Sequence, residues 1–251
     1  MLEIFNTLKF CVDSEKPIAL ATVIGGPGMG NKLLMYPDGK TLGDLGAAAL
    51  NKKAVDQAAG MWNSHQPECV HLEFEEEAFE IFIDIFPPPP RLVIIGAVHI
   101  AIPLVTFANM LDFHTIVIDP RKAFATRERF PHADELIIEW PPDALRKMPL
   151  NESTYIVSLS HDEKLDNPSL QAALENPVRY IGALGSTRTH SMRLKALREL
   201  GIPEEELSRI HAPVGLDLGA KVPEGIALPI IAEIVAASHG ISFKHLAGSD
   251  G

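Results

Sequence analysis

The chain has 251 residues, 46% of them hydrophobic, which is enough to bury one large core or two modest ones. Its net charge of -11 disfavours nucleic-acid and anionic-membrane partners, because phosphates would be repelled by the average field. Two isolated cysteines, no secretion-signal pattern at the N-terminus and no long apolar run predict a cytoplasmic protein without disulfides or a membrane span.

The first part of the sequence predicts a small α+β unit. Its expected elements are, in chain order, strands at residues 17–24 and 32–36, a helix at 47–62, and strands at 69–74 and 79–86. Pro37-Asp38-Gly39 is typical of a turn, and Glu75-Glu76-Glu77 favours a solvated hairpin tip.

Four consecutive prolines, Pro87 to Pro90, favour an extended segment because proline cannot donate ladder hydrogen bonds. We interpret them as a linker between an N-terminal domain, residues 1–86, and a C-terminal domain, residues 91–251. In the second domain we expect strands at residues 91–95, 114–118, 136–138, 155–159 and 179–181, and helices at 100–111, 170–175, 189–200 and 223–237. This alternation predicts a mainly parallel, Rossmann-like sheet. Pro229 should bend or interrupt the last helix.

The first candidate binding segment is the turn that follows the strand at residues 91–95. Gly96 opens the turn, a helix follows, and Asp119 ends the next strand, where a carboxylate can accept hydrogen bonds from a ribose. Val98, however, replaces the middle glycine of the dinucleotide pattern, and its side chain would crowd a pyrophosphate. The pattern therefore favours the fold more than NAD binding, and a turn without nucleotide fits it equally well.

A second candidate is the segment from Gly182 to Arg188. Gly182 and Gly185 permit a backbone anion nest, and Ser186 can cap the helix that follows. The exposed N–H groups of that helix end, together with Arg188, predict an anion site. The alternative is an ordinary capped turn.

Further polar residues follow the other strands. Ser160-His161-Asp162 come after the strand at residues 155–159, and His99, in the first turn, is expected to face the same crevice. The two histidines with Asp119 and Asp162 match no metal-ligand spacing, so we predict polar crevice residues rather than a metal site. The glycine-rich residues 213–220, which include Asp217, can wrap a ligand or simply cross the sheet edge.

Several segments occur in a specific joint order: Gly96-Ala97, Ile118-Asp119-Pro120-Arg121, Arg129-Phe130-Pro131, Ser160-His161-Asp162, and residues 181–186 and 213–220. This order resembles the C-terminal Rossmann domain of the XdhC/CoxI family over residues 91–239. The resemblance to the family continues more weakly in the first domain, at residues 19–23 and 36–39. The resemblance implies an accessory protein of molybdenum hydroxylases such as xanthine dehydrogenase. Such a protein would bind molybdenum cofactor (molybdopterin), assist its sulfuration and deliver it to the apoenzyme.

We therefore expect a non-catalytic cofactor chaperone. The expected cofactor-binding residues are Gly96, His99, Asp119, Arg121, His161, Asp162, Gly182, Gly185, Ser186, Arg188 and Asp217. The expected partners are a hydroxylase apoenzyme, a cysteine desulfurase and a second copy of the chain. One alternative is an oxidoreductase that uses NAD(P) or another nucleotide. The other is a divergent regulatory paralogue without cofactor binding, because residues 25–30 and 43–51 lack the arginine and cysteine of the family's first domain.

Overall fold

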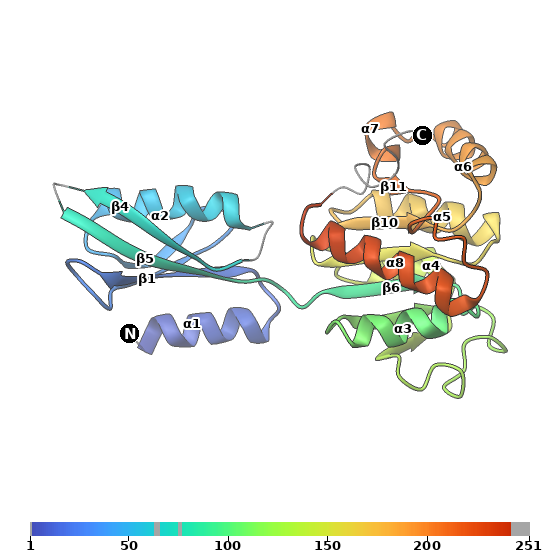
Figure 1. Cartoon of the computed structure of the whole chain (residues 1–251), viewed down its shortest axis with the longest axis horizontal. Coiled ribbons are helices and arrows are strands. Elements are labelled where there is room, and N and C mark those ends of the chain that lie inside the picture. The colour runs from blue at the N-terminus through green and yellow to red at the C-terminus, as the bar shows by residue number, and fades with distance from the viewer. Residues whose placement is uncertain (1, 63–65, 75–76, 242–251) are drawn as a thin grey trace. The chain divides into compact units, whose positions relative to one another are not determined.

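The computed structural model describes residues 2–62, 66–74 and 77–241 (Figure 1). Contacts divide the chain into two compact units, Met1–Pro88 and Pro89–Gly251, so that the division falls within the four consecutive prolines. No described helix is both long and apolar enough to cross a membrane.

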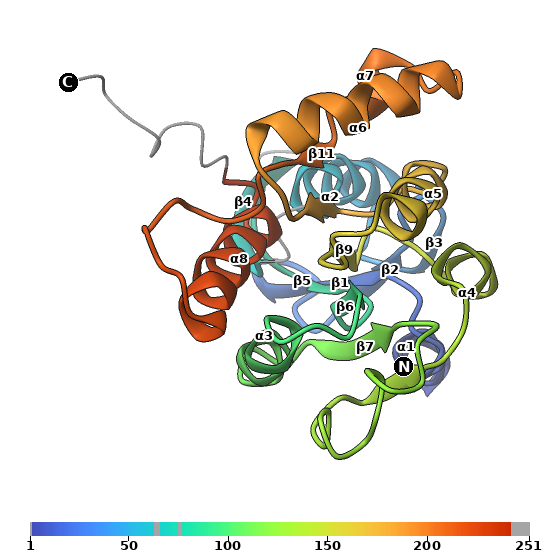
Figure 2. The same ribbon diagram turned by 90° about the vertical axis from the view of Figure 1, so that its right-hand side faces the viewer.

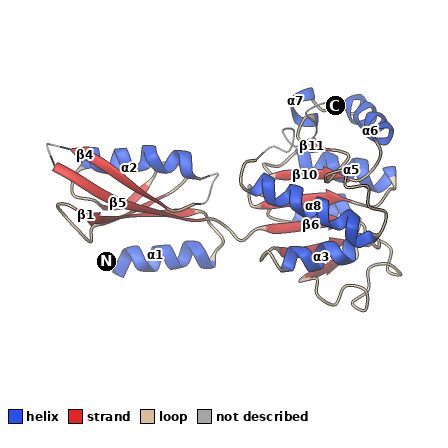
Figure 3. Cartoon of the chain, in the orientation of Figure 1, coloured by secondary structure: helices blue, strands red, loops and turns tan. Residues whose placement is uncertain are grey.

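The N-terminal unit is an antiparallel sheet with one helix on each face (Figure 3). Its elements are α1 (Leu2–Asp13), β1 (Ile18–Gly25), β2 (Lys32–Met35), β3 (Thr41–Asp44), α2 (Ala48–Met61), β4 (Glu68–Phe74) and β5 (Glu77–Phe86), and the strand order is β3-β2-β1-β5-β4. Side chains alternate between the two faces of β1, since Ala19 and Ala21 pack with α2 whereas Ile18 packs with Cys11 of α1.

The C-terminal unit is a parallel sheet in the strand order β11-β10-β9-β6-β7-β8. Its elements are β6 (Arg91–Ile95), α3 (Ala101–Asn109), β7 (His114–Ile118), β8 (Glu135–Ile137), α4 (Pro141–Lys147), β9 (Thr154–Ser158), α5 (Glu163–Leu174), β10 (Tyr180–Ala183), α6 (Thr187–Glu199), α7 (Glu204–Leu207), β11 (Ile210–His211) and α8 (Pro223–Ser238). This is the strand order of the dinucleotide-binding fold, in which the first strand stands at the centre.

Helices cover both faces of the parallel sheet (Figure 2). Leu92 and Ile94 of β6 pack in the cluster that includes α3 and α8, whereas Val93 and Ile95 pack in the cluster that includes α4 and α5. Because both faces are buried, the central strands are continuous apolar runs rather than alternating ones. The predicted α/β class with a parallel second sheet is confirmed.

Several local predictions differ from the structure. Glu77 belongs to β5 rather than to a hairpin tip, and Glu75 and Glu76 lie outside the described residues. Helix α5 begins at Glu163 rather than at residue 170, because the Asp162 side chain caps it by accepting a hydrogen bond from the Lys164 N–H. Helix α8 continues from Pro223 to Ser238 with Pro229 inside it, so this proline does not interrupt the helix.

Five short or atypical elements were not predicted: α1, β3, α4, α7 and β11. Helix α1 leaves Leu2 and Phe5 largely exposed. Helix α4 starts with two prolines, Pro141 and Pro142, which the first helical turn tolerates because its N–H groups have no intrahelical acceptor.

Candidate functional site

The strand order places a topological switch point at the carboxyl ends of β6 and β9. From β6 the chain first builds β7 and β8 on one side, and then crosses to β9 on the other. The helices that follow β6 and β9, α3 and α5, therefore lie on opposite faces of the sheet. Such a switch point is where open α/β sheets bind ligands. The loops that leave β6 and β9 touch, because a Cβ on Gly96 would lie 2.9 Å from the Cα and N of Ser160. Gly96, at φ +101°, is needed both for its backbone angle and for this approach.

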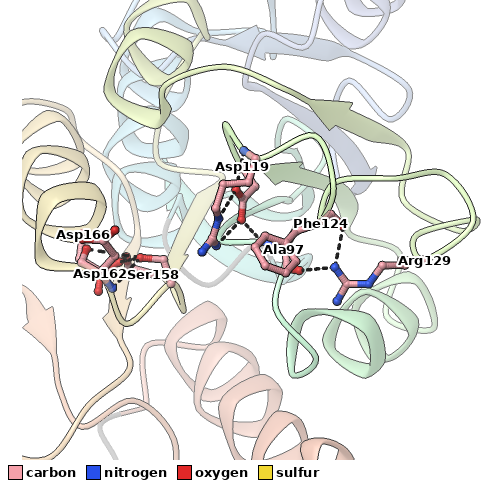
Figure 4. Close-up of polar contacts among 9 residues, drawn as sticks. Ala97, Asp119, Phe124, Arg129, Ser158, Asp162 and Asp166 are labelled. Atoms are coloured by element: carbon pink, nitrogen blue, oxygen red, sulfur yellow. Dashed lines mark hydrogen bonds and ion pairs between the residues drawn. The ribbon is translucent and has the colours of Figure 1, made fainter.

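The Asp119 carboxylate at the end of β7 is already occupied by the chain's own donors. Its Oδ2 accepts from the Ala97 N–H at 2.8 Å and from Arg121 Nη2 at 2.7 Å. Its Oδ1 accepts from the Arg121 N–H at 2.9 Å and from Arg121 Nε at 2.8 Å (Figure 4). Burial alone would raise the pKa of Asp119, but the hydrogen bonds from Arg121 and Ala97 outweigh it and lower the pKa. The expected ribose contact would have to compete with these bonds.

Two arginines and an aromatic ring lie beside this turn. The Arg121 guanidinium is 4.5 Å from the centre of the Phe124 ring, and the Arg129 guanidinium is 5.8 Å from it. Arg129 Nη1 also donates to the carbonyls of Ala97 and Phe124, at 2.9 and 2.7 Å. Arg129 thereby ties the loop after β7 to the turn after β6 (Figure 4). Sequence reasoning did not single out this role, because the acceptors are backbone carbonyls in other segments.

A buried polar network joins the loops that follow β9 and β10. The Oδ1 atom of Asp166 accepts from Ser158 Oγ at 2.6 Å and from Ser160 Oγ at 2.5 Å. Arg193 Nη2 lies 3.6 Å from Asp166 Oδ2 and donates to the Leu184 carbonyl at 3.1 Å. Burial lowers the pKa of Arg193, and the Asp166 charge opposes this shift. Asp166 and Arg193 were missed by sequence reasoning, since only the packing of α5 against α6 brings them together.

Of the predicted residues after β9, Asp162 caps a helix, whereas His161 is exposed. Asp162 Oδ1 caps α5 through the Lys164 N–H at 3.0 Å. His161 is exposed and adopts a left-handed backbone, with φ at +58°. His99, in the turn before α3, is also exposed. Among the residues that the structure describes, no group of three or more histidine, cysteine, aspartate or glutamate side chains is placed to hold a metal ion.

The segment that leads into α6 differs in part from the expected glycine nest. Gly182 lies inside β10, where an added Cβ would meet Val214 and Tyr180 at 2.7 and 2.8 Å, so this glycine serves packing rather than a turn. Gly185, at φ +147°, makes the turn, and Ser186 Oγ caps α6 by accepting from the Thr189 N–H at 3.2 Å. Arg188 is exposed in the first turn of the helix.

A cavity of about 340 Å³ adjoins this helix start. It is lined by Leu184, Gly185, the loop residues Pro213 to Ala220, and Gly225, Ile226 and Pro229 of α8. The side chain of Glu233 holds the loop, since it accepts from the Gly215 N–H at 2.5 Å and bonds to His211 Nδ1 at 2.9 Å. Burial would raise the pKa of Glu233, but the bonds to His211 and Gly215 lower it. Sequence reasoning did not select Glu233 or His211.

Two family models match the chain, one for each unit. The model described as the XdhC Rossmann domain matches residues 92–234, and the model described as the XdhC and CoxI family matches residues 11–74. The chain belongs to the XdhC and CoxI family.

Curated proteins resemble this XdhC and CoxI family chain over different lengths. A protein of Bacillus subtilis (strain 168) named as a probable xanthine dehydrogenase component is 33% identical over 166 residues, which cover 66% of this chain and 48% of that protein. The molybdenum cofactor insertion chaperone PaoD of Escherichia coli (strain K12) is 42% identical over 87 residues, which cover 35% of this chain and 27% of that protein. The chain spans about half or less of the length of the curated relatives it matches.

A solved structure shares the fold of both units. The crystal structure of a protein described as a xanthine dehydrogenase from Bacillus halodurans is 22% identical, with a TM-score of 0.55, and covers 96% of this chain and 98% of that one. At this identity the likeness concerns the fold. Within the family fold, the selected residues of this chain lie near the carboxyl edge of the parallel sheet, and their binding roles stay predictions.

Proposed function

We propose that this chain is an accessory protein that binds molybdenum cofactor and assists its sulfuration and its insertion into a xanthine dehydrogenase-type hydroxylase. The observation that carries the proposal is the cavity of about 340 Å³ beside the start of α6. Its size lies within the range of small-molecule sites, and the adjoining helix end offers backbone N–H groups to an anion. The name of the E. coli relative, a molybdenum cofactor insertion chaperone, supports the same function.

The site suits a phosphate-bearing cargo. The first N–H groups of α6 have no intrahelical acceptor, and among them that of Thr189 is taken by Ser186. Exposed Arg188 adds a positive charge at the same place, in a protein with a net charge of -11. When bound, the cofactor would carry the molybdenum centre that the acceptor enzyme needs. The residues of this chain would bind and hold it.

The sulfur donor would be a partner protein. Both cysteines belong to the N-terminal unit, where Cys11 is buried and Cys69 is exposed on β4. The C-terminal unit, which carries the candidate site, has no cysteine to relay sulfur. We therefore infer a cysteine desulfurase as the second partner, besides the hydroxylase. A second copy of the chain would cover the apolar residues that α1 exposes, Leu2, Phe5 and Phe10.

The test is reconstitution of an apo hydroxylase with supplied molybdenum cofactor. We expect the chain to bind the cofactor and to raise the recovered hydroxylase activity. A charge-assisted contact contributes about 1.5–3 kcal/mol, so Arg188→Ala should weaken cofactor binding by about 10- to 100-fold and require correspondingly more protein for activation.

Arg146→Ala is the matched control, since Arg146 is an exposed arginine on α4 that pairs with Asp143 away from the cavity. It should bind the cofactor as wild type does. If the wild-type chain neither binds the cofactor nor activates the hydroxylase, the accessory function is wrong, and a regulatory paralogue without ligand takes its place.

A further inference from the structure

The loop between β7 and β8 is basic, although the chain as a whole has a net charge of -11. We call residues 120–132 the basic loop, because they include Arg121, Lys122, Arg127 and Arg129 against a single acidic residue, Glu128. The loop leaves the carboxyl end of β7. Since the strands of this sheet are parallel, it lies at the same sheet edge as the turn after β10 that borders the cavity.

Three positive charges of the basic loop are not neutralised by the chain itself. On α4 and α6, by contrast, exposed arginines pair with carboxylates. Among the residues that the structure describes, Lys122, Arg127 and Arg129 form no ion pair with a carboxylate, and the two arginines donate to backbone carbonyls instead. An acidic chain thus keeps one cluster of cations that an anionic partner can approach.

The basic loop has a fixed shape although it contains no helix or strand. Arg127 donates to the Ala133 carbonyl at 2.5 Å, and Arg129 Nη1 donates to the Ala97 carbonyl at 2.9 Å. The Phe130 side chain anchors the loop, because it is buried in the core of the unit. A partner that binds here therefore meets a preformed surface, and little ordering of the loop opposes binding.

An aromatic ring lies among these cations. Phe124 is 44% exposed, and its ring centre is 4.5 Å from the Arg121 guanidinium and 5.8 Å from that of Arg129. Aromatic residues and arginines supply most of the binding energy at protein interfaces, where a central apolar contact is surrounded by polar ones. The composition of the loop is that of a protein-binding surface.

The contacts favour a peptide carboxylate over a nucleotide as the anion. A dinucleotide needs a free acidic acceptor for its ribose at the end of this strand, but each oxygen of the Asp119 carboxylate already accepts two hydrogen bonds from the chain. A carboxylate needs donors only. The Nε and Nη2 groups of Arg129 donate to no other group in the described part of the chain, so they can serve one.

We propose that the basic loop binds an acidic segment of the acceptor enzyme, with carboxylates facing Lys122 and Arg129 and an apolar side chain packed on Phe124. The inference rests on the proposed function and names the surface that the acceptor enzyme uses. Binding there places the acceptor at the same sheet edge as the cavity.

Affinity of the full-length chain for the apo hydroxylase, measured by biolayer interferometry, tests this surface. We expect the affinity to fall by about 10-fold or more between about 0.05 and 0.5 M salt, because salt screens exposed charges. A peptide rich in glutamate and leucine should compete with the hydroxylase. The matched peptide with glutamine in place of glutamate should not.

Two variants separate the charge from the ring. Lys122→Glu should weaken hydroxylase binding about 3- to 10-fold, mainly through slower association, and Phe124→Ala should weaken it by about 10-fold or more. Phe124→Tyr keeps a ring and should bind as wild type does. The charge control is Lys147→Glu on α4, which makes the same change outside the basic loop. All variants should bind molybdenum cofactor with wild-type affinity, and thermal unfolding checks that they fold.

Three results would overturn the docking surface: wild-type hydroxylase binding by both Lys122→Glu and Phe124→Ala, binding that does not depend on salt, or no binding of either hydroxylase or glutamate peptide. Binding of NADPH that Phe124→Ala abolishes would also overturn it and make the loop a nucleotide site.

The cofactor titration separates these failures from failure of the proposed function. A chain that binds the cofactor and activates the hydroxylase, but whose loop variants bind the hydroxylase normally, keeps its accessory function and loses the docking surface. A chain that binds the glutamate peptide through Lys122 and Phe124, but neither the cofactor nor the hydroxylase, keeps an acidic-peptide surface and loses the accessory function.

Discussion

Two turns at the carboxyl edge of the parallel sheet look alike in sequence and differ in the structure. Both follow a strand, contain a glycine with positive φ, and lead to a helix: Gly96 after β6 and Gly185 after β10. At the first turn, Asp119 takes the Ala97 N–H and Ser160 packs against the glycine. At the second, the nearest atoms to an added Cβ on Gly185 belong to the Thr189 side chain, 3.2 Å away.

The difference shows that a glycine turn before a helix is not in itself a ligand site. At Gly96, the chain supplies its own anion, the Asp119 carboxylate, to a backbone N–H that could otherwise bind one from outside. At Gly185, the helix start borders a cavity. We infer that the first turn serves mainly stability and the second mainly binding, and substitutions at the two turns can separate these roles.

The largest effect is expected for Gly96→Ala. The new methyl group would lie 2.9 Å from the backbone of Ser160, and the residue would also adopt a strained φ of +101°. Together these should reduce the free energy of unfolding by about 2–5 kcal/mol. Urea unfolding measures it in a Trp62→Phe background, in which Trp140 is the remaining tryptophan and reports on the C-terminal unit.

Gly201→Ala is a control that separates the cost of a strained φ from the cost of a steric clash of the added methyl group. Gly201 also has a positive φ, +84°, but an added Cβ there meets nothing within 4 Å. This control should cost about 1 kcal/mol. If Gly96→Ala is no more destabilising than Gly201→Ala, the close packing of the two loops is not important for stability.

A smaller loss is expected for Asp119→Asn. The amide keeps one acceptor oxygen but turns an N–H group toward the buried donors of Ala97 and Arg121, which should cost about 1–3 kcal/mol. Asp112→Asn is the control, because Asp112 is exposed at φ +59°, a conformation that asparagine tolerates. Urea unfolding at neutral pH compares the two.

Asp119→Asn should also change how the free energy of unfolding depends on pH. The folded-state pKa of Asp119 is lowered, so its contribution is complete above the unfolded-state pKa of about 4 and is lost as the pH falls through the lower folded-state value. Wild type should therefore lose more stability than Asp119→Asn when the pH is lowered from 5 to 3. If the free energy of unfolding changes with pH in the same way for both proteins, Asp119 is not the charged, hydrogen-bonded carboxylate that we describe.

The smallest effect on stability is expected for Gly185→Ala. Its φ of +147° is strained for alanine, but the 3.2 Å contact is with a side chain, which can move. We expect a loss of about 1 kcal/mol in urea unfolding, together with weaker phosphate binding because the methyl group narrows the approach to the helix start. A loss as large as that of Gly96→Ala would remove the contrast between the two turns.

The sequence was sufficient to predict the strands of the parallel sheet other than β11, and the edge at which the candidate residues gather. The apolar runs at residues 92–95 and 116–118 are typical of strands whose two faces are both covered, and Gly96 and Asp119 directly follow them. Residues that end parallel strands must lie at one edge. These inferences depend on local pattern alone.

The contacts that other segments make with each turn could not be predicted in this way. The contact between Asp119 and the Ala97 N–H depends on the pairing of Ile95 with Ile118, which no local pattern specifies. The Asp166–Arg193 pair likewise needs α5 and α6 to pack. Pro168, inside α5, also hid the true start of that helix, because an internal proline usually signals a break.

The strand order has a further consequence for self-association through sheet edges. The two edge strands of the parallel sheet, β8 and β11, have only 3 and 2 residues, whereas β6 and β9, with 5 each, lie inside. Short edges offer few unpaired backbone groups on which another chain could add a strand. We therefore expect this unit to resist edge-to-edge aggregation even while its carboxyl edge stays open to a ligand.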